Sequence, residues 1–380
     1  MKVVMSGGHL TPALAVIHAF RITAPKTKII FIGREFSQEK EHMRSRERDE
    51  MKKLHIPFFT IEAAKFHRTY FLRNFLEIFR FFPSLRHVYT ILKSERPEVF
   101  ISFGGYLAVP ISIVCKMMNI PIITHEQTRT GGLANQLIAH LADTVAISFE
   151  HSKKYFPKHK VVLTGNPVRP AFHEVFRKKP EWLQHVPLNK PIVYVTGGSQ
   201  GSQVLNQTLR LLLPSLTKHV ILIHQCGGSA SSHYLHELEA EQELLPTQQK
   251  KQYIVREWIK EEDVAWIFQH ADLVVARSGA NTVHEIMMSQ VPAIFIPLPF
   301  SHMNEQLKNA QILEEKGAAV VIQQHDLIPK KLYETILMCL RKSDRMRACA
   351  EEVDKELVTD AAERIVILSQ NLVSRHYPTS

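Results

Sequence analysis

The residues best suited to chemistry lie between Arg277 and Glu285, where an apolar run is followed by Arg-Ser-Gly-Ala-Asn-Thr-Val-His-Glu. This order predicts a strand, a tight turn around Gly279, and a helix that begins at Asn281 or Thr282. Glycine lets the backbone approach a ligand closely, and free amides at a helix start favour an anion. Glu285, about one turn into the helix, could hold the hydroxyls of a ribose. The segment therefore predicts a nucleotide site, with a plain strand–helix corner as the alternative.

Two more glycine-rich turns follow predicted strands. The segment Gly197–Gly201 precedes the helical pattern Val204–Leu213 and could cradle a phosphate with its amides, Ser199 and Gln200. The segment Gly7-Gly8-His9 is the equivalent turn near the beginning of the chain, and it places an imidazole at the carboxyl end of a strand. Glycines at such turns also serve packing alone, so a structural role is the alternative for both segments.

Polar residues follow two other predicted strands, in Ser102–Tyr106 and in His125-Glu126-Gln127. Ligands in parallel-sheet folds bind at strand carboxyl ends, although turn chemistry alone could explain the glycines. Further along, Gln306 and Asn309 are three residues apart and share a helix face. Amides donate and accept hydrogen bonds, which suits sugar hydroxyls, and a solvated helix start is the alternative.

The densest aromatic cluster lies between Phe66 and Phe82, and arginines interleave with it. Spacings of three and four predict a helix with an apolar face. We expect this helix to dock on a membrane surface, because large apolar groups with basic flanks suit the boundary of a bilayer; a core helix is the alternative. The residues expected to touch the membrane are Phe71, Phe75, Phe79, Phe82, Arg73 and Arg80.

Short β-rich runs alternate with longer helical stretches in two series. This alternation predicts α/β architecture with two Rossmann-like, doubly wound parallel sheets and ligands at the strand carboxyl ends. The segment Gly165–Pro170, with two prolines, is typical of a linker. We expect a first domain over 1–165, a second over 166–345, and a helical tail over 346–380 that packs back on the first. The expected strands are Lys2–Met5, Lys28–Ile32, Val99–Phe103, Ile120–Thr124, Thr144–Ser148, Val161–Thr164, Ile192–Thr196, Val220–Gln225, Tyr253–Arg256, Leu273–Ala276 and Ala293–Ile296.

Composition narrows the class of protein. At 380 residues the chain suits two domains, and its four scattered cysteines lack metal-ligand spacing, which predicts free thiols in a reducing compartment. No apolar run is long enough to predict a transmembrane helix or a signal peptide. The net charge is +10, and Lys40–Arg96 holds 13 Lys and Arg against 7 Asp and Glu. This surplus predicts an anionic partner, and acidic lipid is favoured because no nucleic-acid motif accompanies it.

Taken together, these segments resemble the MurG family, the glycosyltransferases that add N-acetylglucosamine to lipid I. The resemblance covers about Met1 to Ile322, and it is specific because the motifs share one order and spacing. They are Gly7-Gly8-His9 with Pro12–Ala15, Ser102–Tyr106, His125–Gln127, Gly165–Arg169, Gly197–Gly201, Arg277–Ala280 with Thr282 and Glu285, and Gln306 with Asn309.

The resemblance implies a GT-B fold, in which a cleft separates two Rossmann-like domains. It implies that the second domain binds the donor UDP-N-acetylglucosamine and that the first binds the acceptor. His9 would be the catalytic base, with Glu126 as second choice. Donor contacts would come from Arg169, Ser199, Gln200, Ile259, Ala280, Glu285, Gln306 and Asn309, and acceptor contacts from Gly7, Gly8, Tyr106, Gln127 and Thr128.

By the same resemblance, the reaction is an inverting transfer to the C4 hydroxyl of lipid I, which forms lipid II for peptidoglycan. It implies a part in cell-wall biogenesis, cell shape and cell division, and it implies neither a metal nor a cofactor, since the nucleotide sugar is a substrate. The implied partners are UDP-N-acetylglucosamine, lipid I, the anionic inner-membrane surface and cell-wall synthesis proteins, without nucleic acid. The implied location is peripheral, on the cytoplasmic face of the bacterial inner membrane.

Three positions depart from the family pattern. The first glycine loop is about three residues shorter than the family's Gly-Gly-Thr-Gly-Gly-His, Thr128 stands where the family has Asn, and Glu305 replaces one of two amides. Three other functions therefore remain as alternatives. They are a GT-B transferase with another lipid acceptor, a UDP-N-acetylglucosamine 2-epimerase, and a non-catalytic scaffold that binds a nucleotide sugar. The aromatic and basic segment argues against the epimerase, which needs no membrane acceptor.

Overall fold

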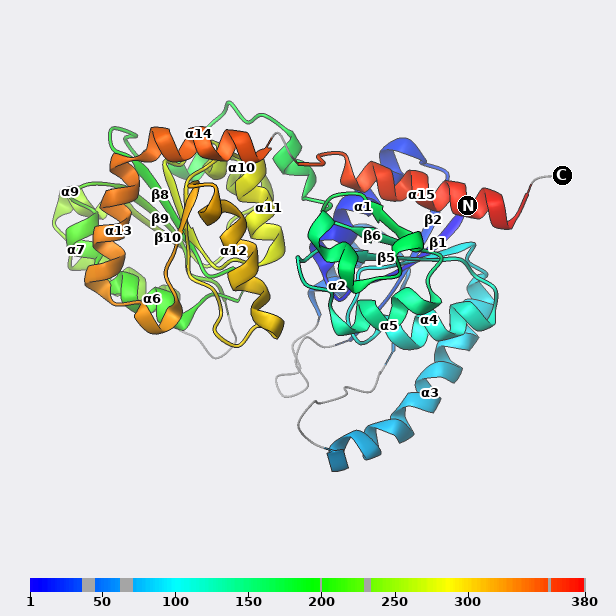
Figure 1. The fold of residues 1–380 in the computed structure, drawn as a ribbon. Helices are drawn as coiled ribbons and strands as arrows, with labels where there is room; N and C mark the ends of the chain where they lie inside the picture. Colours follow the sequence, from blue (N-terminus) through cyan, green and yellow to red (C-terminus); the bar gives the residue numbers. More distant parts are fainter. Residues whose placement is uncertain (36–44, 62–70, 199, 229–233, 355–356, 379–380) are drawn as a thin grey trace. The chain divides into compact units, whose positions relative to one another are not determined.

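In the computed structural model the described residues are 1–35, 45–61, 71–198, 200–228, 234–354 and 357–378, and the side chains of residues 46, 71–81, 302 and 354 lie outside that description. The chain divides into two units, each built on its own parallel sheet (Figure 1). Unit 1 contains Met1–Arg169 and Val358–Ser380, and unit 2 contains Pro170–Leu357. The chain therefore passes between the units twice.

Unit 1 has a seven-stranded parallel sheet with the order β3-β2-β1-β4-β5-β6-β7. Its strands are β1 (Lys2–Ser6), β2 (Lys28–Gly33), β3 (Phe58–Thr60), β4 (Val99–Ser102), β5 (Ile122–Glu126), β6 (Thr144–Ile147) and β7 (Val161–Leu163). Its helices are α1 (Leu10–Thr23), α2 (Arg46–Lys53), α3 (Phe71–Glu95), α4 (Ala108–Met117), α5 (Leu133–Leu141) and α15 (Ala361–His376). The order turns back between β1 and β4, the place where sheets of this kind bind ligands.

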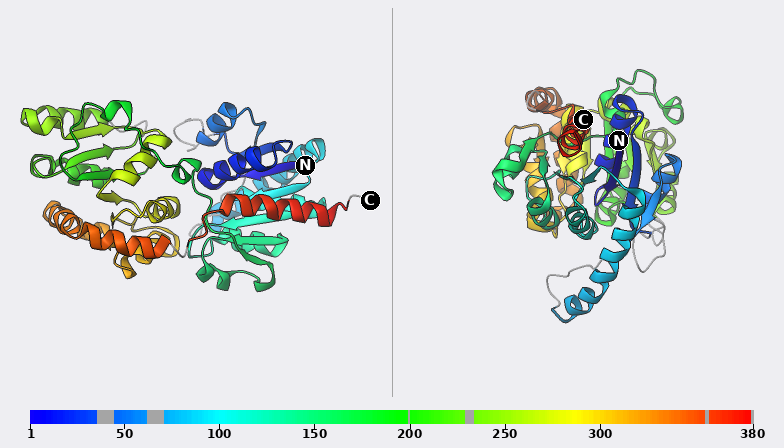
Figure 2. Two further views of the ribbon diagram at one scale, coloured as in Figure 1. Left: turned by 90° about the horizontal axis from the view of Figure 1, so that it is seen from above. Right: turned by 90° about the vertical axis from the view of Figure 1, so that its right-hand side faces the viewer.

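Helices cover both faces of this sheet because successive strand side chains point to opposite sides. Val3 and Met5 pack with α1, α2 and α15, whereas Val4 packs with α3, α4 and α5. The C-terminal helix α15 lies along α1, on the same face (Figure 2). Burial on both faces explains why the inner strands are apolar at consecutive positions.

Unit 2 repeats the design with six parallel strands in the order β10-β9-β8-β11-β12-β13. Its strands are β8 (Ile192–Thr196), β9 (Ile221–Gln225), β10 (Tyr253–Arg256), β11 (Leu273–Ala276), β12 (Ala293–Phe295) and β13 (Ala319–Val321). Its helices are α6 (Gln203–Arg210), α7 (Leu213–Leu216), α8 (Tyr234–Glu243), α9 (Thr247–Lys250), α10 (Glu261–His270), α11 (Ala280–Met288), α12 (Glu305–Glu315), α13 (Pro329–Arg341) and α14 (Ser343–Asp354). Here the order turns back between β8 and β11.

The predicted α/β class with two doubly wound parallel sheets is confirmed, and two strands were missed. The missed strands, β3 and β13, both lie at a sheet edge, have three residues each and are only partly buried. Three half-buried residues are too few to show a period of two, so no alternation marked them in the sequence.

The helical tail 346–380, expected to pack back on the first domain, is divided between the two units. Helix α14 belongs to unit 2, where it packs on α11, and only α15 belongs to unit 1. The chain passes between the units at Arg169–Pro170 and again at Leu357–Val358, rather than after residues 165 and 345. Gly165, with φ +81°, packs against Val358, so the two connecting segments lie side by side at this edge of unit 1.

Candidate active site

The turns that leave β1 and β4 touch each other at the switch point of unit 1. A Cβ atom added to Gly8 would lie 2.8 Å from both the Gly104 carbonyl oxygen and the Gly105 Cα, and one on Gly105 would lie 2.8 Å from the Gly8 Cα. Gly104 and Gly105 also have positive φ angles, of 76° and 83°. Glycine is therefore required here both for conformation and for close approach. The predicted acceptor residues Gly7 and Gly8 lie in this contact or beside it.

His9 directly follows this contact and is the N-cap residue of α1, in an extended conformation. Its side chain is exposed. Desolvation by the surrounding protein and, second, the positive charge of Arg34 lower the pKa of His9 from 6.5 to about 4. The exposed ring also keeps contact with water, which favours its charged form and opposes this lowering of the pKa. The imidazole is neutral near pH 7 and can accept a proton.

Glu126, at the end of β5, is buried and has both carboxylate oxygens occupied. Oε1 accepts a hydrogen bond from the Thr128 amide at 3.0 Å, and Oε2 accepts from the Gly132 amide at 2.8 Å and from Asn135 Nδ2 at 3.0 Å. The Thr128 hydroxyl lies 2.7 Å from Oε1 and also contacts the Thr130 carbonyl oxygen, so its one proton can serve only one of them. These contacts indicate that Glu126 and Thr128 stabilise the loop that follows β5.

Asn135 was not selected from the sequence, yet it connects three segments of this site. Its Oδ1 accepts from the Thr124 hydroxyl at 2.8 Å, and its Nδ2 donates to the His125 carbonyl and to Glu126. The same side chain lies beneath Gly104, whose added Cβ would be 3.0 Å from the amide. An asparagine within a helix carries no motif signal, so only the folded contacts could identify it.

The other predicted residues of unit 1 lie near these loops with different exposure. Gln127 is 6% exposed and its Oε1 has no hydrogen-bond partner, while Tyr106 is partly buried. His125 is buried and contacts the Gly165 carbonyl at 3.0 Å, which anchors the linker to β5. Arg169 ends the first segment of unit 1 and is partly buried. Its predicted donor contact stays a prediction.

In unit 2 the turns after β8 and β11 are neighbours, because Thr196 pairs with Ala276 in the sheet. The first turn is closed by hydrogen bonds from the Gly198 amide to Thr196 Oγ1 at 3.0 Å and from the Gly201 amide to the Gly198 carbonyl at 3.1 Å. Arg277 donates to Ser202 Oγ at 2.7 Å and so ties the two turns together. Ser199 lies outside the described residues, and Gln200 is exposed.

Both turns present backbone to open space. An added Cβ at Gly198 or at Gly279 would meet no heavy atom within 4 Å. Gly279 is the N-cap of α11, which begins at Ala280 rather than at Asn281 or Thr282 as predicted. The amides at the beginnings of α6 and α11 therefore follow adjacent strands. The partly buried guanidinium of Arg277 donates to Ser202 Oγ at the beginning of α6 and to the Ile296 carbonyl at 2.9 Å. This arrangement suits an anion with two charged groups.

Among the described residues of unit 2, Ser278 Oγ and Asn309 Oδ1 are buried without a hydrogen-bond partner, as is Trp266 Nε1 elsewhere in the unit. Ser278 and Asn309 touch, because Asn309 Nδ2 donates to the Ser278 carbonyl at 3.4 Å. Gln306, on the same helix as Asn309, accepts from the Leu298 amide at 3.0 Å. Buried polar atoms are rarely left unpaired, so this corner has capacity for ligand hydroxyls or water.

The remaining donor residues differ in accessibility. Glu285 is only 3% exposed, and Ala280, in the first turn of α11, is 8% exposed. Ile259 is 3% exposed, whereas the preceding Trp258 keeps 53% of its surface exposed. The loop between β10 and α10 thus combines a buried anchor with an exposed indole. Contacts of these residues with a nucleotide stay predictions.

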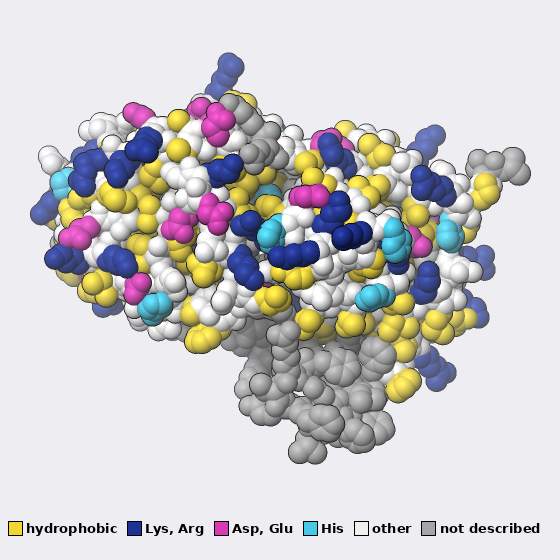
Figure 3. Space-filling model, in the orientation of Figure 1, with side chains coloured by type: hydrophobic (Ala, Val, Ile, Leu, Met, Phe, Trp, Pro, Cys, Tyr) yellow, Lys and Arg dark blue, Asp and Glu magenta, His cyan; other side chains and the backbone are white. Residues whose placement is uncertain are grey.

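The aromatic segment predicted to dock on a membrane falls in the first half of α3. The side chains of Phe71, Arg73, Phe75, Phe79 and Arg80 lie outside the described residues, whereas Phe82 is 67% exposed. Three exposed apolar residues on the neighbouring helices were not selected from the sequence. They are Met117 on α4 and Leu133 and Leu137 on α5. Figure 3 shows apolar side chains beside Lys and Arg on this part of unit 1.

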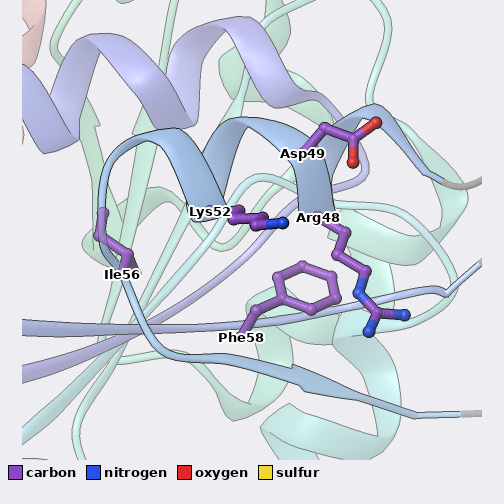
Figure 4. A pocket seen from close by; sticks show the side chains of 5 residues that line it. All are labelled: Arg48, Asp49, Lys52, Ile56 and Phe58. Carbon is purple, nitrogen blue, oxygen red and sulfur yellow. The ribbon is translucent and has the colours of Figure 1, made fainter.

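A pocket of about 320 Å³ lies between α2 and the beginning of β3. Figure 4 shows Arg48 and Phe58 facing each other there, and Asp49, Lys52 and Ile56 complete its lining. None of the predicted site residues lines it, so it is separate from the two switch points.

Within the described ranges we find neither a helix able to cross a membrane nor a group of metal-ligating side chains. All four cysteines are free, and Cys115, Cys226 and Cys339 are buried.

Comparison with known proteins identifies the same two regions. Residues 3–147 match the glycosyltransferase family 28 N-terminal domain, and residues 192–365 match its C-terminal domain. The chain is 32% identical, over 98% of its own length and 98% of the relative's, to the UDP-N-acetylglucosamine--N-acetylmuramyl-(pentapeptide) pyrophosphoryl-undecaprenol N-acetylglucosamine transferase of Acetivibrio thermocellus.

Two solved structures share the fold. The MurG structure from Acinetobacter baumannii has a TM-score of 0.70 at 23% identity and covers 98% of this chain and 100% of its own. The UDP-GlcNAc 2-epimerase of Neisseria meningitidis, bound to UDP-GlcNAc, has a TM-score of 0.64 at 12% identity, with 98% and 100% covered. A shared fold hosts both transfer and epimerisation, so the reaction must be argued from the sites.

Proposed function

The chain belongs to glycosyltransferase family 28, and from that premise we propose that it transfers N-acetylglucosamine from UDP-N-acetylglucosamine to lipid I and so forms lipid II. The observation that carries this proposal is the match to a named transferase over 98% of both chains, at 32% identity. The glycine turns and polar residues at the switch point of each sheet also support it, because transfer between two substrates needs a donor site and an acceptor site.

Unit 2 is the proposed donor-binding domain. The turns after its neighbouring strands β8 and β11 support this, because both leave open backbone, at Gly198 and at Gly279. The diphosphate would lie over Gly198 and Gly279, with Ser199 and Gln200 at its side. From there the nucleoside would extend toward Glu285 and Ile259, and the sugar toward Ala280, Gln306 and Asn309. Arg169 would approach the diphosphate from the linker.

Unit 1 is the proposed acceptor-binding domain. Its contacts would come from the glycine turns and from Tyr106 and Gln127, whose Oε1 is buried and unpaired. The hydrogen bonds of Glu126 and Thr128 support a positioning role for both, since they hold the loop that presents Gln127. We therefore place proton transfer on His9, whose neutral imidazole is the accepting form.

The proposed chemistry is a single displacement with inversion. The C4 hydroxyl oxygen of the N-acetylmuramyl unit attacks the anomeric carbon, the bond from that carbon to the diphosphate oxygen breaks, and His9 takes the hydroxyl proton. Negative charge then grows on UDP as it leaves. The backbone amides at the beginnings of α6 and α11 would stabilise this negative charge as fixed dipoles, and the Arg277 guanidinium would add a positive charge. No metal is needed for this step, so we expect transfer to persist in excess chelator.

The acceptor is anchored in a membrane, and we propose that unit 1 binds the cytoplasmic face of the inner membrane peripherally. Exposed apolar residues on α4 and α5, together with Phe82 on α3, support this. Arg86 and Lys116 are exposed on the same helices and would meet anionic headgroups. Cell-wall synthesis proteins remain proposed partners by the same family relation.

The test is transfer of labelled N-acetylglucosamine from UDP-N-acetylglucosamine to a short-chain lipid I analogue, with and without chelator. A labelled disaccharide on the lipid would support the proposal. Conversion of the donor to its 2-epimer without acceptor would indicate an epimerase instead. Tight binding of UDP-N-acetylglucosamine with neither product would indicate a scaffold or another acceptor.

A further inference from the structure

A chain of three buried side chains runs beneath the glycine turn of unit 2. His224 on β9 is fully buried, and its Nδ1 lies 2.9 Å from the Tyr253 hydroxyl on β10. Its Nε2 lies 3.1 Å from Oδ1 of Asn206 on α6. Asn206 Nδ2 in turn lies 3.0 Å from the carbonyl oxygen of Cys226, the residue that follows β9. The chain thus links two strands and a helix to one backbone carbonyl.

The direction of each hydrogen bond follows from that carbonyl. A carbonyl only accepts, so the Asn206 amide must donate to it, and this fixes Oδ1 toward His224. Oδ1 also only accepts, so His224 must carry its proton on Nε2. In the neutral ring Nδ1 is then the acceptor, and the Tyr253 hydroxyl donates to it. All the hydrogen bonds therefore run one way, from Tyr253 to the Cys226 carbonyl.

Burial keeps this network in one protonation state. Desolvation lowers the pKa of His224 from 6.5 to about 3, and desolvation also raises the pKa of Tyr253. At neutral pH the imidazole has one proton and the phenol keeps its own. At neutral pH the network therefore adopts the one arrangement of donors and acceptors described above.

The carbonyl at the end of the chain touches the glycine turn directly. A Cβ added to Gly201 would overlap with the Cys226 carbonyl oxygen, and one added to Gly227 would overlap with the Gly201 amide nitrogen. Both glycines have positive φ angles, of 76° and 78°. The turn after β8 thus rests on the backbone that Asn206 holds, so a shift of Cys226 must shift Gly201.

We propose that His224 is a positioning residue for the donor diphosphate, acting through Asn206 and the Cys226 carbonyl on the Gly197–Gly201 turn. This inference rests on the proposed function of unit 2 as the UDP-sugar domain. His224 touches no substrate; it sets where the turn amides point. Dipoles stabilise a diphosphate only if they are held in place before it binds, so loosening the turn weakens binding without removing any ligand contact.

The test compares His224→Phe with His224→Gln. Phenylalanine keeps a ring in the cavity but removes both hydrogen bonds, whereas the glutamine amide offers one donor and one acceptor. We expect His224→Phe to weaken UDP binding, measured by titration calorimetry, by about tenfold or more. The KM for UDP-N-acetylglucosamine should rise with it, and the KM for the lipid I analogue should stay within about twofold. His224→Gln should recover most of the UDP affinity.

A matched control separates positioning from loss of stability. Leu332→Ala removes a fully buried side chain from the same hydrophobic core, on α13. At a comparable loss in melting temperature, it should leave UDP affinity within about twofold of the unsubstituted protein. If Leu332→Ala and His224→Phe weaken UDP binding equally, or if His224→Phe leaves it unchanged, the inference is wrong.

These outcomes can be told apart from failure of the proposed function. Transfer by the unsubstituted protein tests the function, whereas the ratio of UDP affinities between variants tests the positioning role. UDP binding without transfer would remove the proposed reaction and leave the ratio measurable. Absence of UDP binding by the unsubstituted protein would overturn both.

Discussion

Gly8 and Gly105 touch backbone to backbone, although nearly a hundred residues separate them in the sequence. Each would place an added Cβ 2.8 Å from the other's Cα. They follow β1 and β4, the two strands at which the sheet order of unit 1 turns back. The contact brings His9 and Tyr106 to one edge of the sheet.

Substituting Gly8 should therefore damage unit 1 itself. In Gly8→Ala the methyl group has nowhere to go, because the atoms it meets are backbone, and we expect a loss of about 1–3 kcal/mol in the free energy of unfolding. Transfer should fall at the same time, since the turn must move. Urea unfolding and the transfer assay check this. An alanine variant of unchanged stability would show that the two turns separate readily.

Gly279→Ala is the matched opposite case. An added Cβ there meets no atom within 4 Å, and its φ of −62° is accessible to alanine. We expect the free energy of unfolding to fall by less than about 1 kcal/mol, the usual scale for a helix cap. UDP affinity should fall about tenfold or more, because the methyl group would occupy the space where a phosphate approaches. Unaltered UDP affinity would place the diphosphate elsewhere.

Glu126→Gln and His9→Ala should fail in different ways. The glutamine amide would face donors from Gly132 or Thr128, so we expect a loss of about 1–3 kcal/mol in stability together with reduced activity. His9 is exposed and accepts no side-chain cap hydrogen bond, so His9→Ala should keep its stability and lose turnover. Thermal melts measure the stability of each variant, and kcat measures its turnover. A stable Glu126→Gln variant without turnover would return the base assignment to Glu126.

The pH dependence of activity offers a second check on His9. Its pKa is lowered toward about 4, so the imidazole remains in the accepting form well below pH 6.5. If it is the base, the acid limb of kcat/KM should lie below the usual histidine range. A limb near pH 6.5 that disappears in His9→Ala would show that its ring is solvated, and a limb that persists in this variant would belong to another group.

Unit 2 should lose stability in mild acid. The pKa values of His224 and His284 are lowered by burial to about 3 and about 4, so the unfolded chain takes up protons below pH 6.5 while the folded unit does not. Above pH 6.5 neither group contributes. Between pH 6.5 and about 4, each should lower the free energy of unfolding by up to about 1.4 kcal/mol per pH unit. Urea unfolding followed by tryptophan fluorescence measures this, because Trp182, Trp258 and Trp266 all lie in unit 2.

The control for this effect is a histidine on the surface. The side chain of His236 is 83% exposed, so His236→Gln should leave the pH slope unchanged, whereas His224→Gln should reduce it. Equal slopes in all three proteins would mean that other groups set the acid sensitivity.

Removing exposed apolar groups from α4 and α5 should weaken membrane binding without unfolding unit 1. Met117, Leu133 and Leu137 are 75%, 44% and 61% exposed, so the triple serine variant loses little buried area. We expect at least a tenfold drop, about 1.4 kcal/mol, in binding to vesicles that contain phosphatidylglycerol. Ile22→Ser, on α1 at the opposite face of the sheet, is the control. If the triple variant sediments with vesicles like the unsubstituted protein, these helices do not face the bilayer.

The central strands and the glycine turns could be predicted from the sequence because their causes are local. Strands buried on both faces must be apolar at consecutive positions, and a positive φ or a close approach leaves glycine almost alone at its position. These two rules predicted the inner strands and most of the glycine turns, whereas the order of the strands, and with it the switch points, came only from the folded sheets. The edge strands β3 and β13 escaped because half-exposed three-residue strands obey neither rule.

What the site residues do was decided only by tertiary structure. The sequence predicts that Glu126 is a carboxylate available at the end of a strand. In the structure Gly132 and Asn135, at the beginning of the following helix, donate hydrogen bonds to it. Arg277 meets Ser202 from 75 positions away, and His224 acts on a turn that it never touches. Residue types and spacing state which hydrogen bonds a side chain can make. Which of them remain for a substrate depends on neighbours that only the folded chain supplies.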